Sequence, residues 1–374
     1  MTAIKQQGVA ETNKDRRRVL TQLFSLGAML PFACSGDTLA ALLAKPNGNN
    51  LEPLLKGVRY FGCAKREDNY YVLSFDEQFR QQFESPLVAR GHGLAIAKMQ
   101  RQLIVLDRRP GRSIHIFDAL SGQKVQQIDL SPTLSLAGHA ALHPDSQRLY
   151  VSAYENSSSE GLVQVYDWQE QHWELSETWP KLGTGPHELL AFEQGVVVAI
   201  GGIKTLARKT IELENIQAQL IFLNHQGKVL SRHQLDNADL SVRHLSGSWD
   251  KLVVACQAQL HPESVNSLVY LCEQQQSLKP LDHGAHYWPL FEGYIGSVEV
   301  YQDTIVASSP RAGLLGSWDA TGQLKSLLNI EQVCGLTSVE GQLVVSTGTG
   351  DLGHQDQLQA NDYHWDNHLL AASF

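Results

Sequence analysis

The sequence predicts an all-β protein, a seven-bladed β-propeller whose ring is closed by the C-terminal strand. Two observations carry this prediction. Short apolar runs of strand length alternate with polar turns along most of the chain, which has 374 residues including 30 glycines. In addition, one short motif recurs seven times at the start of such a run. A repeat of about 40–50 residues that contains four short strands is the signature of a propeller blade.

The recurring motif, called the anchor below, is a His or a small residue at the mouth of a short apolar strand. The five histidine anchors are His92, His139, His187, His244 and His368, and the other two are Ser297 and Gly335. Successive anchors from His92 to Gly335 lie 47, 48, 57, 53 and 38 residues apart. The inner strands of a propeller surround a central channel, so each anchor is expected to face that channel from its own blade.

The other strands follow in order along each unit. The first unit has three predicted strands, residues 58–63, 69–75 and 78–83, and the second has four, residues 93–97, 103–106, 113–117 and 124–128. Similar units begin at residues 138, 186, 244, 297 and 335, and the one from residue 186 carries an insertion at residues 201–219. The first unit lacks an anchor and the His368 strand lacks a blade. Joining them completes seven blades and leaves no open sheet edge.

The N-terminus is predicted to be an export signal. The expected division is a signal at residues 1–40, a polar linker at residues 41–57 and the propeller at residues 58–374. Three arginines at residues 16–18 precede a modest apolar run with small residues near Ala40, which is the composition of a signal peptide. The paired arginines resemble the twin-arginine signal for export of folded proteins to the bacterial periplasm, although Asp15 and Val19 depart from its usual pattern. The alternative is a short transmembrane anchor, but the apolar run is shorter than the ~20 residues that a spanning helix needs.

Composition limits the partners that the mature chain is expected to have. The formal net charge is −9, and the body of the chain has no block of basic residues. Nucleic acid is therefore not an expected partner. Beyond the signal, no stretch is long and apolar enough to span a bilayer, so no membrane span is expected in the mature chain.

Cleavage near Ala40 would leave four cysteines. These are Cys63, Cys256, Cys272 and Cys334. The periplasm permits disulfides, and Cys256 and Cys272 lie in strand-like runs of one unit, so they are one possible pair. The other interpretation is that all four are buried thiols in strands. Their spacing does not match a zinc or CxxC pattern.

Several segments resemble the family called domain of unknown function 1513. They are residues 90–93, 185–189, 201–203, 241–245, 294–298, 309–313, 333–335 and 365–369. The resemblance implies an exported bacterial protein of propeller type with no established activity. It also implies a genetic association with periplasmic iron-uptake components, namely imelysin-type proteins and a haem-containing oxidase-like protein. Those proteins are the expected partners, in an iron or redox setting.

The five histidine anchors are candidate metal ligands. Imidazole binds Fe, Cu, Zn and Ni, and the expected cofactor is a transition metal, Fe or Cu. A ligating His needs a hydrogen-bond acceptor for its second ring nitrogen, and Glu188 and Asp366 lie beside anchors in the sequence. A second candidate set could bind an anionic ligand such as a chelated metal, because guanidinium groups favour carboxylates and phosphates. It consists of Arg108, Arg109, Glu188, Lys204, Arg243 and Arg311.

The sequence leaves three interpretations of the histidines open. They could join neighbouring blades through hydrogen bonds to the backbone, bind a metal or a haem edge, or bind a small anionic molecule. At the level of function, a periplasmic binding or scaffold protein in iron acquisition is favoured, because no nucleophile–base pair stands out. The alternative is a propeller enzyme, either a metal-dependent redox protein or a lactonase-like hydrolase.

The paired arginines provide a test of export. Replacing both Arg16 and Arg17 by Lys should leave the precursor in the cytoplasm, because twin-arginine recognition depends on the guanidinium groups, which Lys does not reproduce. Cell fractionation and immunoblotting measure the outcome, with Arg18→Lys as the control that should be exported normally. Periplasmic accumulation of the double variant would instead indicate the general secretory route.

Overall fold

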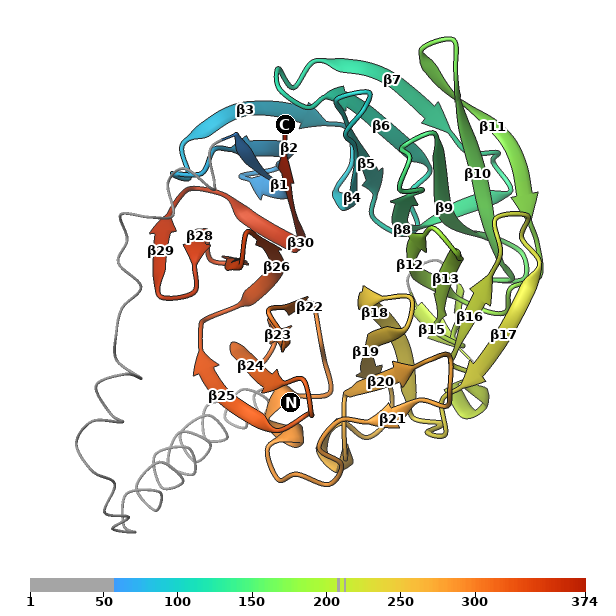
Figure 1. Cartoon of the computed structure of the whole chain (residues 1–374), viewed down its shortest axis with the longest axis vertical. Helices are drawn as coiled ribbons and strands as arrows, with labels where there is room; N and C mark the ends of the chain where they lie inside the picture. The colour runs from blue at the N-terminus through green and yellow to red at the C-terminus, as the bar shows by residue number, and fades with distance from the viewer. Residues whose placement is uncertain (1–56, 207–208, 212) are drawn as a thin grey trace, which may run out of the picture. The chain divides into compact units, whose positions relative to one another are not determined.

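The computed structural model describes residues 57–206, 209–211 and 213–374. The predicted export signal and residues 41–56 of the predicted linker lie outside the described residues. Within them, 30 strands form seven four-stranded sheets and one two-stranded sheet. The seven sheets are arranged as blades around one axis, with the strand labels running outward from the centre (Figure 1). This confirms the prediction of an all-β, seven-bladed propeller.

Each blade is a meander of antiparallel strands that extends from an innermost strand beside the axis to an outer strand. From inside to outside, the first blade is β30 (His364–Ser373), β1 (Val58–Arg66), β2 (Asn69–Phe75) and β3 (Gln81–Leu87). The second is β4 (Gly91–Ala97), β5 (Gln102–Asp107), β6 (Ser113–Asp118) and β7 (Lys124–Asp129). The third is β8 (Leu134–Leu142), β9 (Arg148–Glu155), β10 (Gly161–Gln169) and β11 (His172–Trp179). The fourth is β12 (Pro186–Phe192), β13 (Gly195–Ile200), β16 (Gln219–Leu223) and β17 (Val229–Gln234).

The last three blades follow the same plan. The fifth is β18 (Leu240–Ser248), β19 (Lys251–Ala258), β20 (Val269–Glu273) and β21 (Lys279–Pro280). The sixth is β22 (Ser297–Tyr301), β23 (Thr304–Ser309), β24 (Leu314–Asp319) and β25 (Leu324–Asn329). The seventh is β26 (Val333–Val339), β27 (Gln342–Thr347), β28 (Asp351–His354) and β29 (Gln357–Ala360). The described residues also include the hairpin β14 (Lys204–Leu206) and β15 (Lys209–Ile211) and the 3-10 turns η2 (Leu213–Asn215), η3 (Pro262–Ser264) and η4 (Trp288–Phe291).

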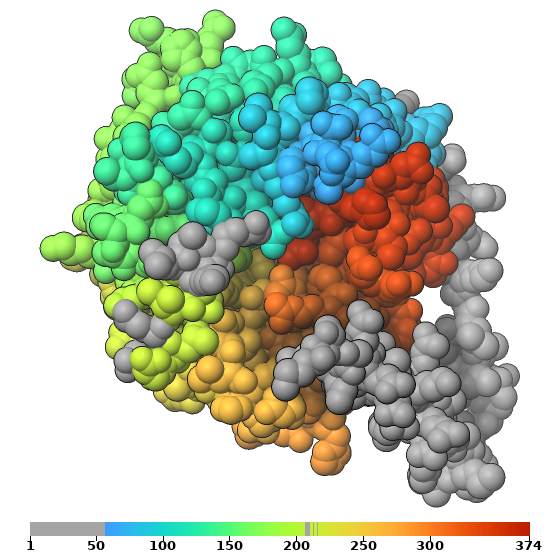
Figure 2. Space-filling view, turned by 180° about the vertical axis from the view of Figure 1, so that it is seen from behind, coloured from blue at the N-terminus to red at the C-terminus, as the bar shows by residue number. Residues whose placement is uncertain are grey.

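The ring closes through the C-terminal strand. β30 pairs antiparallel with β1, from Val58 opposite Ser373 to Lys65 opposite His364. Figure 2 shows the C-terminal residues, in red, packed beside the first strands, in blue. The last strand of the chain is therefore the innermost strand of the first blade, as predicted.

Burial is greatest in the second strand of a blade and least in the outer strand. All six residues of β13 are buried, whereas the outer strand β17 alternates between exposed and half-buried positions. The second strand of each blade is covered on both faces by the neighbouring blades, so its sequence is a continuous run of apolar residues. An outer strand has one face in solvent. The cores between the blades include large aromatic contacts, such as the stacked rings of Trp288 and Trp318, 5.3 Å apart.

The structure shifts the start of one predicted strand. The third strand begins at Gln81 rather than at residue 78, because the Asp76 carboxylate accepts hydrogen bonds from the backbone N–H groups of Gln78 and Arg80 and holds a turn there. All four cysteines in the described residues are buried free thiols. Cys272 lies opposite Leu252 in the sheet, four residues from Cys256, or about 13 Å along the strand, which is too far for a disulfide.

Among the described residues, no helix has the length and apolar character needed to cross a membrane.

Ring closure leads to a stability prediction. Deleting residues 362–374 removes the innermost strand of the first blade, including buried Trp365 and Leu369, and strips the backbone partners from β1. A single buried Trp→Ala change lowers the free energy of unfolding by about 3–5 kcal/mol, and we expect the truncation to lower that of the whole propeller by more than this. The thermal midpoint by circular dichroism measures this. A chain that lacks only residues 1–40 is the control, and an unchanged midpoint for the C-terminal truncation would contradict the closure.

Candidate functional site

The anchors lie in irregular positions of the inner strands. In six of the seven inner strands, the register against the second strand shifts at the anchor. Only β22, which begins with Ser297, pairs with a regular register. A bulge bends its strand and redirects a side chain, which is why bulges occur beside binding sites. Each His was predicted to lie at the mouth of its strand, whereas the structure places three of them inside their strands, beside the bulge, namely His139, His244 and His368.

Close backbone approach between blades accompanies these bulges. A Cβ at Gly93 would lie 2.1 Å from the carbonyl oxygen of Gly138 in the next blade. Gly138 has φ +101°, and a Cβ there would lie 2.9 Å from Cδ2 of His92. Glycine is thus required at both positions, by space at the first and also by conformation at the second.

The five histidine rings gather at the axis. His92 and His368 have ring centroids 4.5 Å apart, and His139 and His187 have ring centroids 4.6 Å apart. His244 completes the cluster, 4.9 Å from His187 and 5.0 Å from His368. Five blades that are successive around the ring therefore bring their anchors into mutual contact. We call these five residues the histidine cluster.

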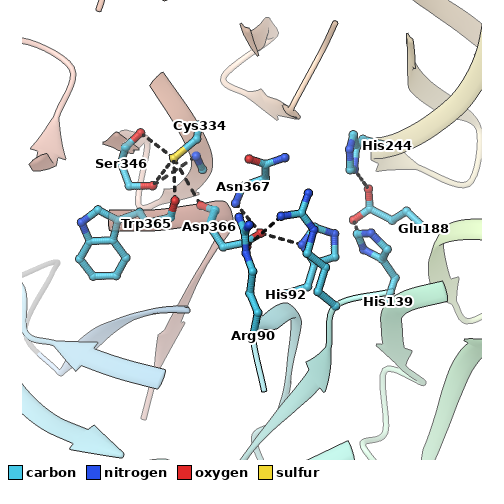
Figure 3. Close-up of polar contacts among 12 residues, drawn as sticks. Arg90, His92, His139, Glu188, His244, Cys334, Ser346, Trp365, Asp366 and Asn367 are labelled. Atoms are coloured by element: carbon cyan, nitrogen blue, oxygen red, sulfur yellow. Dashed lines mark hydrogen bonds and ion pairs between the residues drawn. The ribbon is translucent and has the colours of Figure 1, made fainter. Parts of the chain in front are cut away.

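Asp366 fixes the orientation of one ring. Its Oδ1 lies 2.7 Å from Nδ1 of His92, and its Oδ2 accepts a 2.5 Å hydrogen bond from Nε of Arg90 (Figure 3). Burial alone would raise the pKa of Asp366, but His92, Arg90 and Arg108 hold that pKa well below its usual range. The carboxylate is therefore ionised and can accept the Nδ1 proton of His92, which makes Nε2 the ring nitrogen that His92 can offer to a metal.

Glu188 does the same for a second ring. Its Oε2 lies 3.2 Å from Nδ1 of His244 and accepts a hydrogen bond of 2.9 Å from the backbone N–H of Leu245. Its other oxygen lies 3.8 Å from Nδ1 of His139, within ion-pair range (Figure 3). Burial raises the pKa of Glu188, while His368, the Leu245 N–H and His92 act in the opposite direction.

Three buried ring nitrogens of the histidine cluster have no hydrogen-bond partner among the described residues. They are Nε2 of His139, Nδ1 of His187 and Nε2 of His368, and all are buried. Leaving a buried polar atom unsatisfied costs about 1–3 kcal/mol. Such atoms are the expected signature of residues that are kept for a ligand rather than for packing.

The donor atoms form three overlapping groups of metal-ligand type. The groups are His92, His139 and His368; His139, His187 and His244; and Glu188, His244 and His368, each with donor atoms within 4.8 Å of one another. Two nitrogens that bind one ion in tetrahedral geometry at about 2.0–2.1 Å lie roughly 3.4 Å apart. Donor pairs near the 4.8 Å limit would therefore need to close by about 1.4 Å when a metal binds.

Burial keeps most of the cluster neutral. Burial is the first cause that lowers the pKa of His139, His187 and His368 well below the usual value, and neighbouring histidines add to it. The same causes lower the pKa of His244 to about 3. Neutral imidazole is the form that binds a metal.

A cavity of about 400 Å³ borders the cluster. Its lining includes His139, Glu188, Ser297, Glu299, Ser338 and His368. The lining residues of each inner strand follow the anchor in the sequence, so the cavity occupies the end of the channel toward which the inner strands run.

The candidate anion-binding residues occupy several positions. Nη1 of Arg108 lies 3.9 Å from Asp366, and the charge of Arg109 lowers the pKa values of His139 and His187. Arg311 lies over the ring of Tyr294, 4.2 Å from its centroid, and Lys204 begins the β14–β15 hairpin. Arg243 is buried in the bulge of β18.

Three residues that contribute to the site were not predicted from the sequence. Arg90 bonds Asp366, Tyr294 accepts a hydrogen bond of 3.1 Å from Nδ2 of Asn367, and Glu299 accepts one of 2.6 Å from Oγ of Ser338. Arg90 carried a signal, since it stands two residues before an anchor. Tyr294 and Glu299 lie three residues before and two residues after the anchor Ser297, so the repeat marked their segment but did not single out either side chain.

Comparison with known proteins places the chain in a family. The family model described as "Protein of unknown function (DUF1513)" matches residues 85–372. The chain belongs to this family. Members of the family are therefore the natural material for testing whether the histidine cluster is general. A search of curated protein sequences found no match.

Solved structures support the fold. Kuenenia stuttgartiensis hydrazine synthase is similar with a TM-score of 0.57 and 12% sequence identity, over 82% of this chain and 92% of that chain. Chaetomium thermophilum Raptor is similar with a TM-score of 0.52 and 10% identity, over 77% of this chain and 25% of that chain. At these identities the likeness concerns the propeller architecture alone.

The neutral cluster predicts how stability depends on pH in metal-free protein. A histidine whose pKa is lower in the folded state binds fewer protons there than in the unfolded chain. Stability linked to His139, His187, His244 and His368 should thus be constant above about pH 6.5 and fall as the pH drops below it, by at most about 1.4 kcal/mol per pH unit for each ring. Burial raises the pKa of Glu188, and raises that of Glu299 to about 7, which offsets part of this loss.

Denaturant melts between pH 7 and pH 4 in the presence of a chelator test this dependence. The double variant His139→Asn with His368→Asn should show at most about half the dependence on pH that the wild type shows. His172→Asn, at an exposed outer position, is the control and should leave the dependence unchanged. Equal pH dependence in the wild type and the double variant would show that the cluster is not held neutral.

Proposed function

We propose that the histidine cluster binds a first-row transition metal, iron or copper, and that the protein acts as a periplasmic binding or scaffold protein in iron acquisition. The observation that carries the metal proposal is the convergence of three unpartnered, buried ring nitrogens in one cluster. A cluster built only to join blades would direct its ring nitrogens to backbone carbonyl groups. In this cluster the polar partners of His92 and His244 are carboxylates instead.

The carboxylates support metal binding in a second way. A ligating His usually donates its other ring N–H to a carboxylate or carbonyl, which fixes the tautomer and raises the basicity of the donor nitrogen. Asp366 and Glu188 stand in this relation to His92 and His244. Imidazole with carboxylate is a donor set that suits iron and copper, and the iron setting rests on the associations of the family that the sequence resembles.

Binding is favoured over turnover by the state of the buried thiols. Burial raises the pKa of Cys63 well above its usual value and that of Cys334 to about 12, and both lie near Asp366. Protonated, buried thiols are poor nucleophiles. The groups at the axis are therefore suited to hold a ligand rather than to attack one.

Removing two shared ligands should abolish metal binding. His139 and His368 each belong to two of the three donor groups, so His139→Ala with His368→Ala leaves no group of three intact. We expect wild-type protein to bind one Fe²⁺ or Cu²⁺ tightly and the double variant to bind it at least about a hundredfold more weakly. Calorimetric titration measures affinity and stoichiometry, and elemental analysis of protein purified from the periplasm identifies the metal.

The control is His172→Ala, which should bind as the wild type does. Thermal melts of both variants establish that they are folded. Micromolar titrations in which the wild type binds none of Fe, Cu or Zn would refute the metal proposal. Wild-type affinity in the double variant would locate the metal elsewhere.

A further inference from the structure

Arg243 is a buried cation that lacks a protein counter-charge. The residue is 4% exposed and occupies the bulge of β18, between Val242 and His244. Its Nε is buried without a hydrogen-bond partner. Among the described residues, no carboxylate forms an ion pair with it. A buried charge is costly unless it is paired, so a chain that retains one at a site is expected to bring a partner to it.

The two carboxylates of the site are engaged elsewhere. Asp366 receives hydrogen bonds from Arg90, His92 and the backbone N–H of Asn367. Glu188 is held by His244 and the backbone N–H of Leu245. Neither carboxylate is therefore available to neutralise Arg243.

The charges around Arg243 increase its need for an anion. The nearby guanidinium of Arg109 repels the charge of Arg243. The thiol of Cys256, which lies near Arg243, stays neutral because burial raises its pKa. No carboxylate of the described residues therefore offsets the charge of Arg243 by an ion pair.

Tyr294 adds a hydrogen-bond donor to the same region. Its hydroxyl accepts the hydrogen bond from Asn367, so its own proton remains to be donated. Its ring lies under the guanidinium of Arg311, which fixes the ring and adds a third positive charge.

We propose that this region is a binding site for a small oxyanion, a carboxylate or a phosphate, held by Arg243 with Arg109 and Tyr294. The planar fork of a guanidinium matches both oxyanions through two parallel hydrogen bonds. Arg243 directly precedes His244 in the strand, whereas the residues that line the cavity follow the anchors. The anion therefore lies on the side of the histidine cluster opposite the cavity. The site does not depend on a bound metal, because its groups are not the metal donors.

Arg243→Gln tests the site. Metal-free wild type should bind citrate, acetate or inorganic phosphate in calorimetric titration at constant ionic strength, and each ligand that binds should raise the thermal midpoint. The Gln variant should bind at least about tenfold more weakly, since a hydrogen bond to a charged group is lost. Preference for citrate and acetate over phosphate identifies a carboxylate ligand, and the reverse preference identifies a phosphate ligand.

The variant also separates this role from a structural one. An unpaired buried cation should not stabilise the ligand-free fold, so Arg243→Gln should melt at the wild-type temperature or above it. If the Gln variant does not fold, Arg243→Lys keeps the charge without the fork and should still weaken binding about tenfold. Arg232→Gln, on the exposed outer strand β17, is the matched control and should bind as the wild type does.

Two results would overturn the proposal. The first is that Arg243→Gln binds oxyanions as tightly as the wild type does. The second is that the wild type binds none of the three oxyanions at ~10 mM, which is about the weakest affinity that calorimetry detects. The metal proposal is tested apart from it. The His139→Ala, His368→Ala variant should keep its oxyanion affinity in the absence of metal while it loses the metal site.

Discussion

The approach of the inner strands to the axis is the constraint on which the site depends. Gly93 and Gly138 allow neighbouring blades to approach more closely than any side chain at those positions would permit. At this spacing a regular strand would direct its side chains between the blades, and the bulges at the anchors direct them to the axis instead. The result is a cluster of imidazoles that is desolvated by the fold itself. Its neutrality and its unpartnered nitrogens both follow from that burial.

The two carboxylates of the site show how burial and charge compete. Asp366 is buried and Glu188 is partly buried, and burial raises the pKa of each. Beside Asp366, two arginines and His92 overcome that effect, so the carboxylate remains a fixed negative charge. Beside Glu188, the neighbours are neutral rings and one backbone N–H, and the pKa stays raised. The same chemical group thus supplies a permanent acceptor on one side of the cluster and a weaker, more easily protonated one on the other.

The sequence predicted those features that repeat. The period of the anchors indicated seven blades, and the missing strand of the first unit indicated the closure by β30. The repeated His pointed to the candidate ligands, and residues beside the anchors pointed to Glu188 and Asp366 as their acceptors. A repeat cannot predict what occurs once. The turn that delays β3 is made by one carboxylate, Asp76, and the bulges depend on backbone pairing that has no fixed residue type.

Arg243 is a second example of a feature that the sequence alone could not predict. In the sequence it is one of several arginines near the channel and looks no different from Arg311. In the structure Arg311 lies over an aromatic ring, while Arg243 is buried with an unpartnered Nε. Burial and pairing are properties of the assembled ring, because they depend on neighbours from blades that are distant in the sequence. Only tertiary structure could therefore separate the two.

The channel is electrically polar along its axis, and this polarity links the two proposed sites. The positions before the anchors supply Arg90, Arg243 and Asp366, and because Arg90 pairs with Asp366, Arg243 is the charge left without an ion-pair partner among the described residues. Residues that follow them supply Glu188 and Glu299, which line the cavity. A cation in the cluster is attracted from the cavity side, and an anion is attracted from the arginine side. Because unit charges interact more strongly in a buried site than in water, a metal ion and an oxyanion bound on opposite sides of the cluster would each strengthen the binding of the other. The coupling should be reciprocal, so the factor by which an oxyanion tightens metal binding must equal the factor by which the metal tightens binding of the oxyanion.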